Sequence, residues 1–425
     1  MKFLKNYLPI DLVVLLAVFV GVLTHKDLTG APEAIPTSPS SSPKRPVNLD
    51  SDLPSGGSNS EFFSVSPIAL SDLISITPLG NPNPPAHTFP TDHIYFYVKR
   101  AGPASMPGAL PPAAEVTVFS PGDITILQVN SKDYLSSTQK GFKPHTDYQM
   151  DFALCKEFRG RFDHLASLSD KIKSQHQESD ENTHTYSTGG TTVKFHSTKV
   201  HIKLKAGEII GTAGGPNGSN ALDFWAFDYR ITPHVYANPS RWRENSFYVV
   251  CPIDYFIPTV RDTLRKRLGS FDGTLRTEPP LCGEVAQDKS GTAQGIWFVK
   301  GTTFAKEATR SNPEDAHLAL VHDNVDPSKC VFSMGISMEG KGLPSGAYYF
   351  VSQHSGLINR DFGEITADGN VYCYEVESRF RQEGSKAILL LQMINPTTVR
   401  IEKFDGASRG DGPWKFGSNY VEFGR

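Results

Sequence analysis

Short runs of β-branched and aromatic residues recur along most of this chain, separated by glycine and proline turn signals. Runs of this kind are typical of β-strands, and turns such as Asn217-Gly218 join strands into hairpins. The chain also contains 26 Phe and 15 Tyr, which favour strands, so it is predicted to be mainly β. The runs occupy residues 93–98, 114–119, 124–129, 148–154, 193–204 and 221–228, then 295–299, 318–322, 331–334, 347–351, 371–377, 387–391 and 399–404.

Changes in composition divide the 425 residues into an N-terminal segment, a tether and two folded parts. The tether is rich in Pro, Ser and Gly, a composition typical of flexible linkers. Near residues 260–268 a short helical pattern gives way to Gly, Thr and a Pro-Pro pair, where we place the second boundary. The second domain is expected to be an antiparallel barrel or sandwich. The predicted segments are a signal-anchor at residues 1–25, a linker at 26–60, a first β domain at 61–275 and a second at 276–425.

The N-terminus has the layout of an exported protein. Lys2 and Lys5 precede an apolar run at residues 12–23. This run is shorter than the ~20 residues of a typical membrane span, although residues 7–24 together could cross a thin bilayer. No clear cleavage site follows, so we favour an uncleaved membrane anchor over a cleaved signal peptide. Either alternative places the folded domains outside the cytoplasm, at the cell envelope or as a secreted protein.

Charge and cysteine usage narrow the functional classes. The formal net charge is −3 and the charges are interspersed, so nucleic acid is not expected as a partner. The five cysteines lack the C-x-x-C spacing of structural zinc sites. One or two disulfides or buried free thiols remain as alternatives, and the pairing stays open. The sequence also lacks a phosphate-binding glycine loop and the G-x-S-x-G motif of serine hydrolases.

Three segments of the first domain carry a family resemblance. The first, residues 79–92, contains His87 and Asp92, and the second, residues 161–169, contains His164. The third contains Lys205-Ala-Gly-Glu-Ile-Ile-Gly-Thr-Ala-Gly214 and then Ala221-Leu-Asp-Phe224. In this order they resemble the lysostaphin-type (LytM-like) zinc peptidases, which cut peptidoglycan cross-bridges. The resemblance extends over residues 79–229.

This resemblance implies a lipoyl-like β domain of the duplicated-hybrid-motif fold, with zinc as its cofactor. It assigns metal binding to His87, Asp92 and Asp223, and a catalytic role to His164. Four residues separate His87 from Asp92, where the family has three, and the family's His-x-His segment reads Ala-x-Asp here. His93 could replace a ligand, although neighbouring residues of a strand point to opposite faces. The expected metal site is therefore degenerate.

These observations lead to one main functional hypothesis and two alternatives. The main hypothesis is an exported, non-catalytic relative of the lysostaphin-type peptidases, whose groove binds peptidoglycan peptide or an envelope protein. The first alternative is an active zinc endopeptidase, in which zinc lowers the pKa of a bound water to ~7 and His164 assists. The second is a structural surface protein that binds through its C-terminal domain. His317 and His322, five residues apart, would face opposite sides of one strand, and we interpret both as surface or rim residues.

Overall fold

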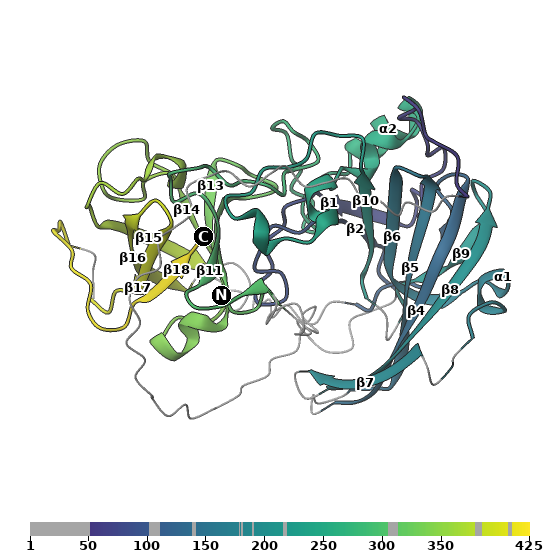
Figure 1. The fold of residues 1–425 in the computed structure, drawn as a ribbon, viewed down its shortest axis with the longest axis horizontal. Helices are drawn as coiled ribbons and strands as arrows, with labels where there is room; N and C mark the ends of the chain where they lie inside the picture. Colours follow the sequence, from purple (N-terminus) through teal and green to yellow (C-terminus); the bar gives the residue numbers. More distant parts are fainter. Residues whose placement is uncertain are drawn as a thin grey trace, which may run out of the picture.

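Two β units make up the part of the chain that the structure describes, a ten-stranded sheet and a closed eight-stranded barrel (Figure 1). This confirms the predicted mainly β fold, and the second domain is a barrel. The apolar segment at residues 12–23 lies outside the described residues. Within the described part, no helix has the length and apolar character needed to span a bilayer. The computed structural model describes residues 52–101, 111–137, 142–177, 179, 182–188, 191–215, 219–304, 313–378, 385–406 and 410–425.

The large sheet is antiparallel throughout its main path, which runs β1-β2-β10-β6-β5-β4-β8-β7, while β9 pairs with both β6 and β3. The predicted helix at residues 260–268 is α2, which starts earlier because Pro258 suits the first helical turn. The strands are β1 Leu73–Thr77, β2 Ile94–Val98, β3 Val116–Phe119, β4 Ile124–Ser137, β5 His145–Cys155, β6 Phe158–Leu168, β7 Thr183–Thr188, β8 Thr191–Leu204, β9 Ile209–Ala213 and β10 Ala221–Asp228. The helical segments are α1 Asp170–Lys173, η2 Pro239–Arg241, η3 Glu244–Tyr248, η4 Pro252–Tyr255 and α2 Pro258–Arg265.

The two faces of this sheet differ in polarity. On one face, the rings of Phe152, Phe162 and Phe224 are fully buried and in mutual contact in the core. Side chains alternate along a strand, so the neighbouring positions point to the other face. There Asp223 of β10 pairs in register with Asp163 of β6. Charged side chains are therefore brought together on one face of the central strands.

The barrel is an up-and-down arrangement in which each strand pairs with the next and β18 closes on β11. Its interior is apolar, with Trp297, Phe332 and Tyr374 among the buried side chains. Short helical turns connect some of its strands. The elements are β11 Gly295–Val299, β12 Leu318–His322, β13 Lys329–Met334, η5 Ile336–Lys341, β14 Gly346–Val351, η6 Phe362–Glu364, β15 Tyr372–Ser378, β16 Lys386–Asn395, β17 Thr398–Lys403 and β18 Val421–Gly424.

The outer face of β11, β12 and β13 packs against the first unit. Phe89, from the loop before β2, contacts the ring of Phe298, and Ser333 Oγ donates to the Thr88 carbonyl at 2.6 Å. His317 lies in this interface, fully buried, with its ring stacked on Phe89 and its Nδ1 accepting from the Val299 N–H. The prediction of a surface or rim position for His317 was wrong, because it did not foresee that this barrel face is covered.

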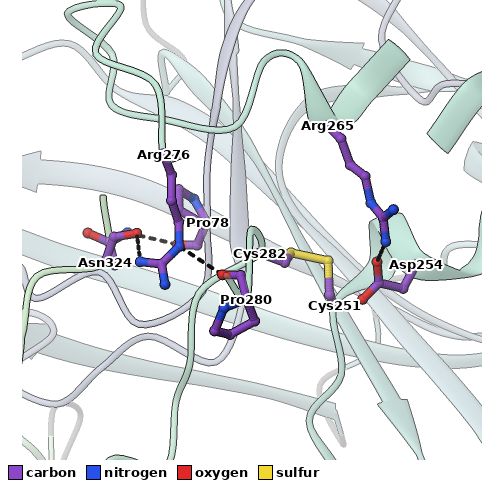
Figure 2. Close-up of a disulfide and its surroundings, with 8 residues drawn as sticks. All are labelled: Pro78, Cys251, Asp254, Arg265, Arg276, Pro280, Cys282 and Asn324. Carbon is purple, nitrogen blue, oxygen red and sulfur yellow. Dashed lines mark hydrogen bonds and ion pairs between the residues drawn. A yellow bond between two sulfur atoms is a disulfide. The ribbon is translucent and has the colours of Figure 1, made fainter. Parts of the chain in front are cut away.

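A disulfide ties the segment before the barrel to the first unit. Cys251 is bonded to Cys282, and the remaining cysteines, at positions 155, 330 and 373, are free and buried. Figure 2 shows Arg276 beside this disulfide, donating to the carbonyl oxygens of Pro280 and Asn324 at 2.8 and 2.9 Å. Asn324 in turn donates to the Pro78 carbonyl at 3.0 Å. The segment is therefore connected both to the large sheet and to the barrel.

Candidate functional site

A chain of alternating carboxylates and imidazoles crosses the polar face of the large sheet. Asp92 Oδ1 lies 3.0 Å from His93 Nδ1, and His93 Nε2 lies 3.4 Å from Asp223 Oδ2. The same Asp223 oxygen lies 3.5 Å from His164 Nε2, and His164 Nδ1 lies 2.7 Å from Asp147 Oδ2. Three of the four residues with a predicted site role, Asp92, Asp223 and His164, thus belong to one connected group.

The order of the strands explains this convergence. β10 lies between β2 and β6, and β5 lies beyond β6, so residues distant in sequence become neighbours. Asp92 and His93 directly precede β2, and both contact the same site. They were expected on opposite faces, but that rule holds only inside a strand, and β2 begins at Ile94.

The backbone of His164 has an unusual conformation. Its φ of 65° lies in the left-handed region, which costs roughly 1–2 kcal/mol for a residue with a Cβ. Its N–H donates to Asp163 Oδ1 at 2.8 Å, and the pairing of β5 with β6 shifts register near this point. Such strain is concentrated at functional sites in proteins. The conformation therefore marks His164 as a functional candidate independently of its side-chain contacts.

The ammonium group of Lys132 already neutralises Asp163, the carboxylate next to this chain. Lys132 Nζ lies 2.9 and 2.8 Å from the two oxygens of Asp163, and Gln149 donates to the same carboxylate at 2.8 Å. Burial favours the neutral carboxyl, but Lys132 and His164 hold the pKa of Asp163 well below its usual value. Asp147, Asp163 and His164 lie close enough to share a metal ion, yet the Lys132 ammonium group supplies the positive charge there.

The three histidines of the site differ in charge. Burial opposes protonation of His93, but Asp223 and Asp92 raise its pKa to about 9. Burial likewise opposes protonation of His164, whose pKa is raised to about 10 by Asp147 and Asp223. His87 lies edge-on to His93, and burial together with that neighbour lowers its pKa to about 4. At neutral pH the site thus holds two imidazolium ions and one neutral imidazole.

The predicted zinc ligands His87, Asp92 and Asp223 are not arranged as a three-ligand set. Asp92 Oδ1 instead accepts a hydrogen bond from Trp225 Nε1 at 2.7 Å and contacts His93. Among the residues that the structure describes, only two groups hold three ligand atoms within 4.8 Å of one another, and neither contains this trio. Those groups are Asp147–Asp163–His164 and His322–Cys330–Asp361.

One observation does suit a metal. His93 Nε2 and Asp223 Oδ1 are buried and lack hydrogen-bond partners. The 3.4 and 3.5 Å separations to Asp223 Oδ2 exceed the 2.7–2.9 Å of a strong charge-assisted bond. They are close to the ~3.4 Å that separates two light ligand atoms around a tetrahedral zinc ion. A zinc site also needs three ligand atoms that all lie close to one another. His93, Asp223 and His164 do not form such a group of three.

Two members of this chain, Asp92 and His164, and the neighbouring Arg161 remain partly accessible to solvent. Arg161 of β6 pairs with Asp151 of β5, and its guanidinium lies 5.9 Å from the ring of Trp225. The side chains of Asp92, His164 and Arg161 are 41, 34 and 33 % exposed. This partly exposed set, Asp92, Asp151, Arg161, His164 and Trp225, is called the polar patch below.

The second unit contributes one residue to the edge of the site. Glu314, from the segment before β12, accepts a hydrogen bond from the Phe89 N–H at 3.1 Å. Burial raises the pKa of Glu314 to about 8, and the nearby charge of Asp92 acts in the same direction. The site therefore lies at the junction of the sheet and the barrel.

Sequence reasoning missed several residues of this site. Asp147 and Asp151 follow an alternating polar pattern along β5, and Lys132 continues one along β4, so a search for strands with one polar face could have found them. Glu314 gave no such signal, because only the packing of the barrel brings it to the site.

Comparisons of this chain with protein-family models, curated proteins and solved structures gave no match. The resemblance to lysostaphin-type peptidases therefore rests on the sequence segments alone and stays a prediction.

Proposed function

We propose that the first unit is a non-catalytic binding domain, related to the lysostaphin-type peptidases, that holds a cell-wall peptide or an envelope protein at the polar patch. One observation carries this proposal. Partly exposed charges of both signs, among them Asp92, Arg161 and His164, lie together on the polar face of the strands. A peptide lying across these strands would meet acceptors and donors for its own amide groups and charged ends.

The contacts of the buried histidines support a non-catalytic role. His93 and His164 each face a carboxylate oxygen through both ring nitrogens. This environment favours the protonated ring, whereas a metal ligand must be neutral. In this function the contacts of His93, Asp223 and Asp147 keep the strands in position, and the polar patch provides the binding contacts.

The Cys251–Cys282 disulfide supports an extracytoplasmic location, since disulfides persist mainly in oxidising compartments. We propose that residues 7–24 anchor the chain in the membrane and that both β units lie at the cell envelope.

Calorimetric titration of the full chain with purified peptidoglycan peptides tests the binding function. We expect Arg161→Gln and Asp92→Asn to weaken binding about tenfold, the loss of one hydrogen bond to a charged group. Lys205→Gln is the matched control, because Lys205 is 80 % exposed and its ammonium group pairs with Asp123 at the surface. Unchanged affinity in the two patch variants, or an equal loss in the control, would contradict binding at the polar patch.

The alternative function is zinc-dependent peptide hydrolysis, favoured by the two buried atoms without partners in His93 and Asp223. Zinc held there would have only nitrogen and oxygen ligands. Stoichiometric zinc that is lost in Asp223→Asn, together with cleavage of the peptides, would replace the binding function by the enzymatic one.

A further inference from the structure

A second group of side chains that could hold a metal ion lies at one end of the barrel interior. His322 is the last residue of β12, Cys330 lies directly opposite it on β13, and Asp361 precedes η6. Their ligand atoms all lie within 4.8 Å of one another. The neighbouring inward positions on the same strands, Leu320 and Phe332, are apolar and fully buried. The group is thus a polar cluster at the end of an apolar barrel.

Two of the distances within this group are close to those around a zinc ion. His322 Nε2 lies 3.5 Å and Cys330 Sγ lies 3.7 Å from the same oxygen, Asp361 Oδ2. A tetrahedral zinc ion, with bonds of about 2.0–2.1 Å to N and O and 2.3 Å to S, separates N from O by about 3.4 Å and S from O by about 3.6 Å. The nitrogen–oxygen distance is long for a charge-assisted hydrogen bond.

Hydrogen bonds orient these side chains so that their ligand atoms face one another. His322 Nδ1 lies 2.8 Å from the Pro327 carbonyl oxygen and 3.9 Å from Cys330 Sγ, while Nε2 faces Asp361 Oδ2. Because a carbonyl oxygen only accepts, Nδ1 carries the proton and the Nε2 lone pair is available to a metal. Asp361 Oδ1 accepts from the Gly363 N–H at 2.9 Å, which leaves Oδ2 facing the other two residues. Metal-binding histidines and carboxylates are commonly held in this way.

Burial and ligand type indicate which ion would bind. Cys330 is fully buried and Asp361 nearly so, whereas the His322 side chain is 27 % exposed and gives solvent access to the cluster. A thiolate with an imidazole and a carboxylate suits zinc rather than magnesium or calcium, which prefer oxygen ligands. The other free cysteines, Cys155 and Cys373, belong to no such group among the described residues.

We propose that His322, Cys330 and Asp361 bind one zinc ion at the end of the barrel. Three protein ligands leave the fourth coordination position for water or for a small molecule that enters the barrel end. This zinc site is independent of the polar patch, because the zinc site lies in the barrel and the two share no residue.

X-ray absorption of the zinc-loaded full chain tests the site without any substitution. We expect one sulfur ligand at about 2.3 Å and nitrogen or oxygen ligands at about 2.0–2.2 Å. Loading with Co²⁺ should give the near-ultraviolet charge-transfer absorption of a cobalt–thiolate bond. Failure to bind zinc stoichiometrically, or a zinc shell without sulfur, would overturn the proposal.

Variants then identify the sulfur and its neighbours. Cys330→Ser should abolish the cobalt–thiolate absorption, and His322→Gln should weaken zinc binding at least about tenfold. Cys373→Ser, a change at another buried free cysteine, and Asp223→Asn in the first unit are controls that should keep the absorption. Circular dichroism verifies that each variant folds. If Cys330→Ser does not fold, the X-ray absorption of the wild type decides whether zinc has a sulfur ligand. Absorption retained in folded Cys330→Ser would contradict the assignment.

Discussion

His164 has more contacts with charged groups than its motif suggested. Its ring lies between the carboxylates of Asp147 and Asp223, and its backbone N–H donates to Asp163. These contacts are made with a left-handed backbone at this residue, the only residue of β6 with a positive φ. Its role in the fold is therefore electrostatic as well as conformational.

The charge of His164 predicts a pH-dependent stability. Asp147 and Asp223 raise its pKa to about 10 despite burial, so its contribution is fully present below the unfolded-state pKa of about 6.5. It is lost as the pH rises from there through 10. We expect His164→Gln to destabilise the protein most at pH 6 and progressively less toward pH 10. Urea unfolding across this range measures the difference, and a constant difference would contradict the prediction.

Glu314 predicts a second pH dependence of stability, at lower pH. Burial raises its pKa to about 8, so the folded state keeps a proton that the unfolded state loses above about pH 4.3. Stability should therefore fall as the pH rises from about 5 to 8. Glu314→Gln should remove the part of this fall that Glu314 causes, so its stability relative to the wild type should rise from pH 5 to 8. The exposed Glu278→Gln serves as control, and an unfolding curve for Glu314→Gln that still follows the wild type would refute the assignment.

The strands themselves were predicted with uneven success. The intervals 221–228, 295–299 and 318–322 agree with β10, β11 and β12 at both ends. β4 extends well beyond its apolar run, because its polar second half pairs with β5 and β8. β6 was not predicted as a strand, since its inward Phe158, Gly160 and Phe162 alternate with Arg159, Arg161 and Asp163 on the polar side. β7 was also not among the predicted strands, and it pairs with β8.

The close approach of β9 to β6 depends on a glycine. A Cβ added to Gly211 would lie 1.9 Å from the Ser167 carbonyl oxygen, so Gly211→Ala must push the two strands apart. We expect a loss of about 1–3 kcal/mol in the free energy of unfolding, as in other overpacked positions. Gly340→Ala is the control, because no atom would lie within 4 Å of its new Cβ. Chemical denaturation of both variants measures the effect, and equal stability of the two would contradict this reason for the glycine.

At the scale of the whole molecule, the segment before the barrel connects the two units. Cys282 is bonded to Cys251, Gly283 forms a parallel bridge with Leu79, and Arg276 reaches the carbonyl of Asn324 (Figure 2). Phe89 and Glu314 add contacts between the sheet and the barrel. The position of the polar patch, at the junction of the two units, depends on this packing.

Removal of the disulfide tests how much this connection stabilises the fold. The bond closes a loop with a sequence separation of 31, for which chain entropy predicts about 3–4 kcal/mol. We expect a Cys251→Ser, Cys282→Ser double variant to lose about this much stability in chemical unfolding. A reducing agent should destabilise the wild type similarly and leave the double variant unchanged. Sensitivity of the double variant to the reductant would show that other cysteines are responsible.

The sequence by itself determined the mainly β class, most strands, the short helix and the candidates His164 and Asp223, because these follow from local patterns or short motifs. Tertiary structure alone decided that the second domain closes as a barrel and that Cys251 pairs with Cys282. It also placed His93 between Asp92 and Asp223, and brought Cys330 and Asp361 to His322. The physical reason is that propensity and alternation depend on neighbouring residues, whereas site geometry depends on which strands pair and in which register.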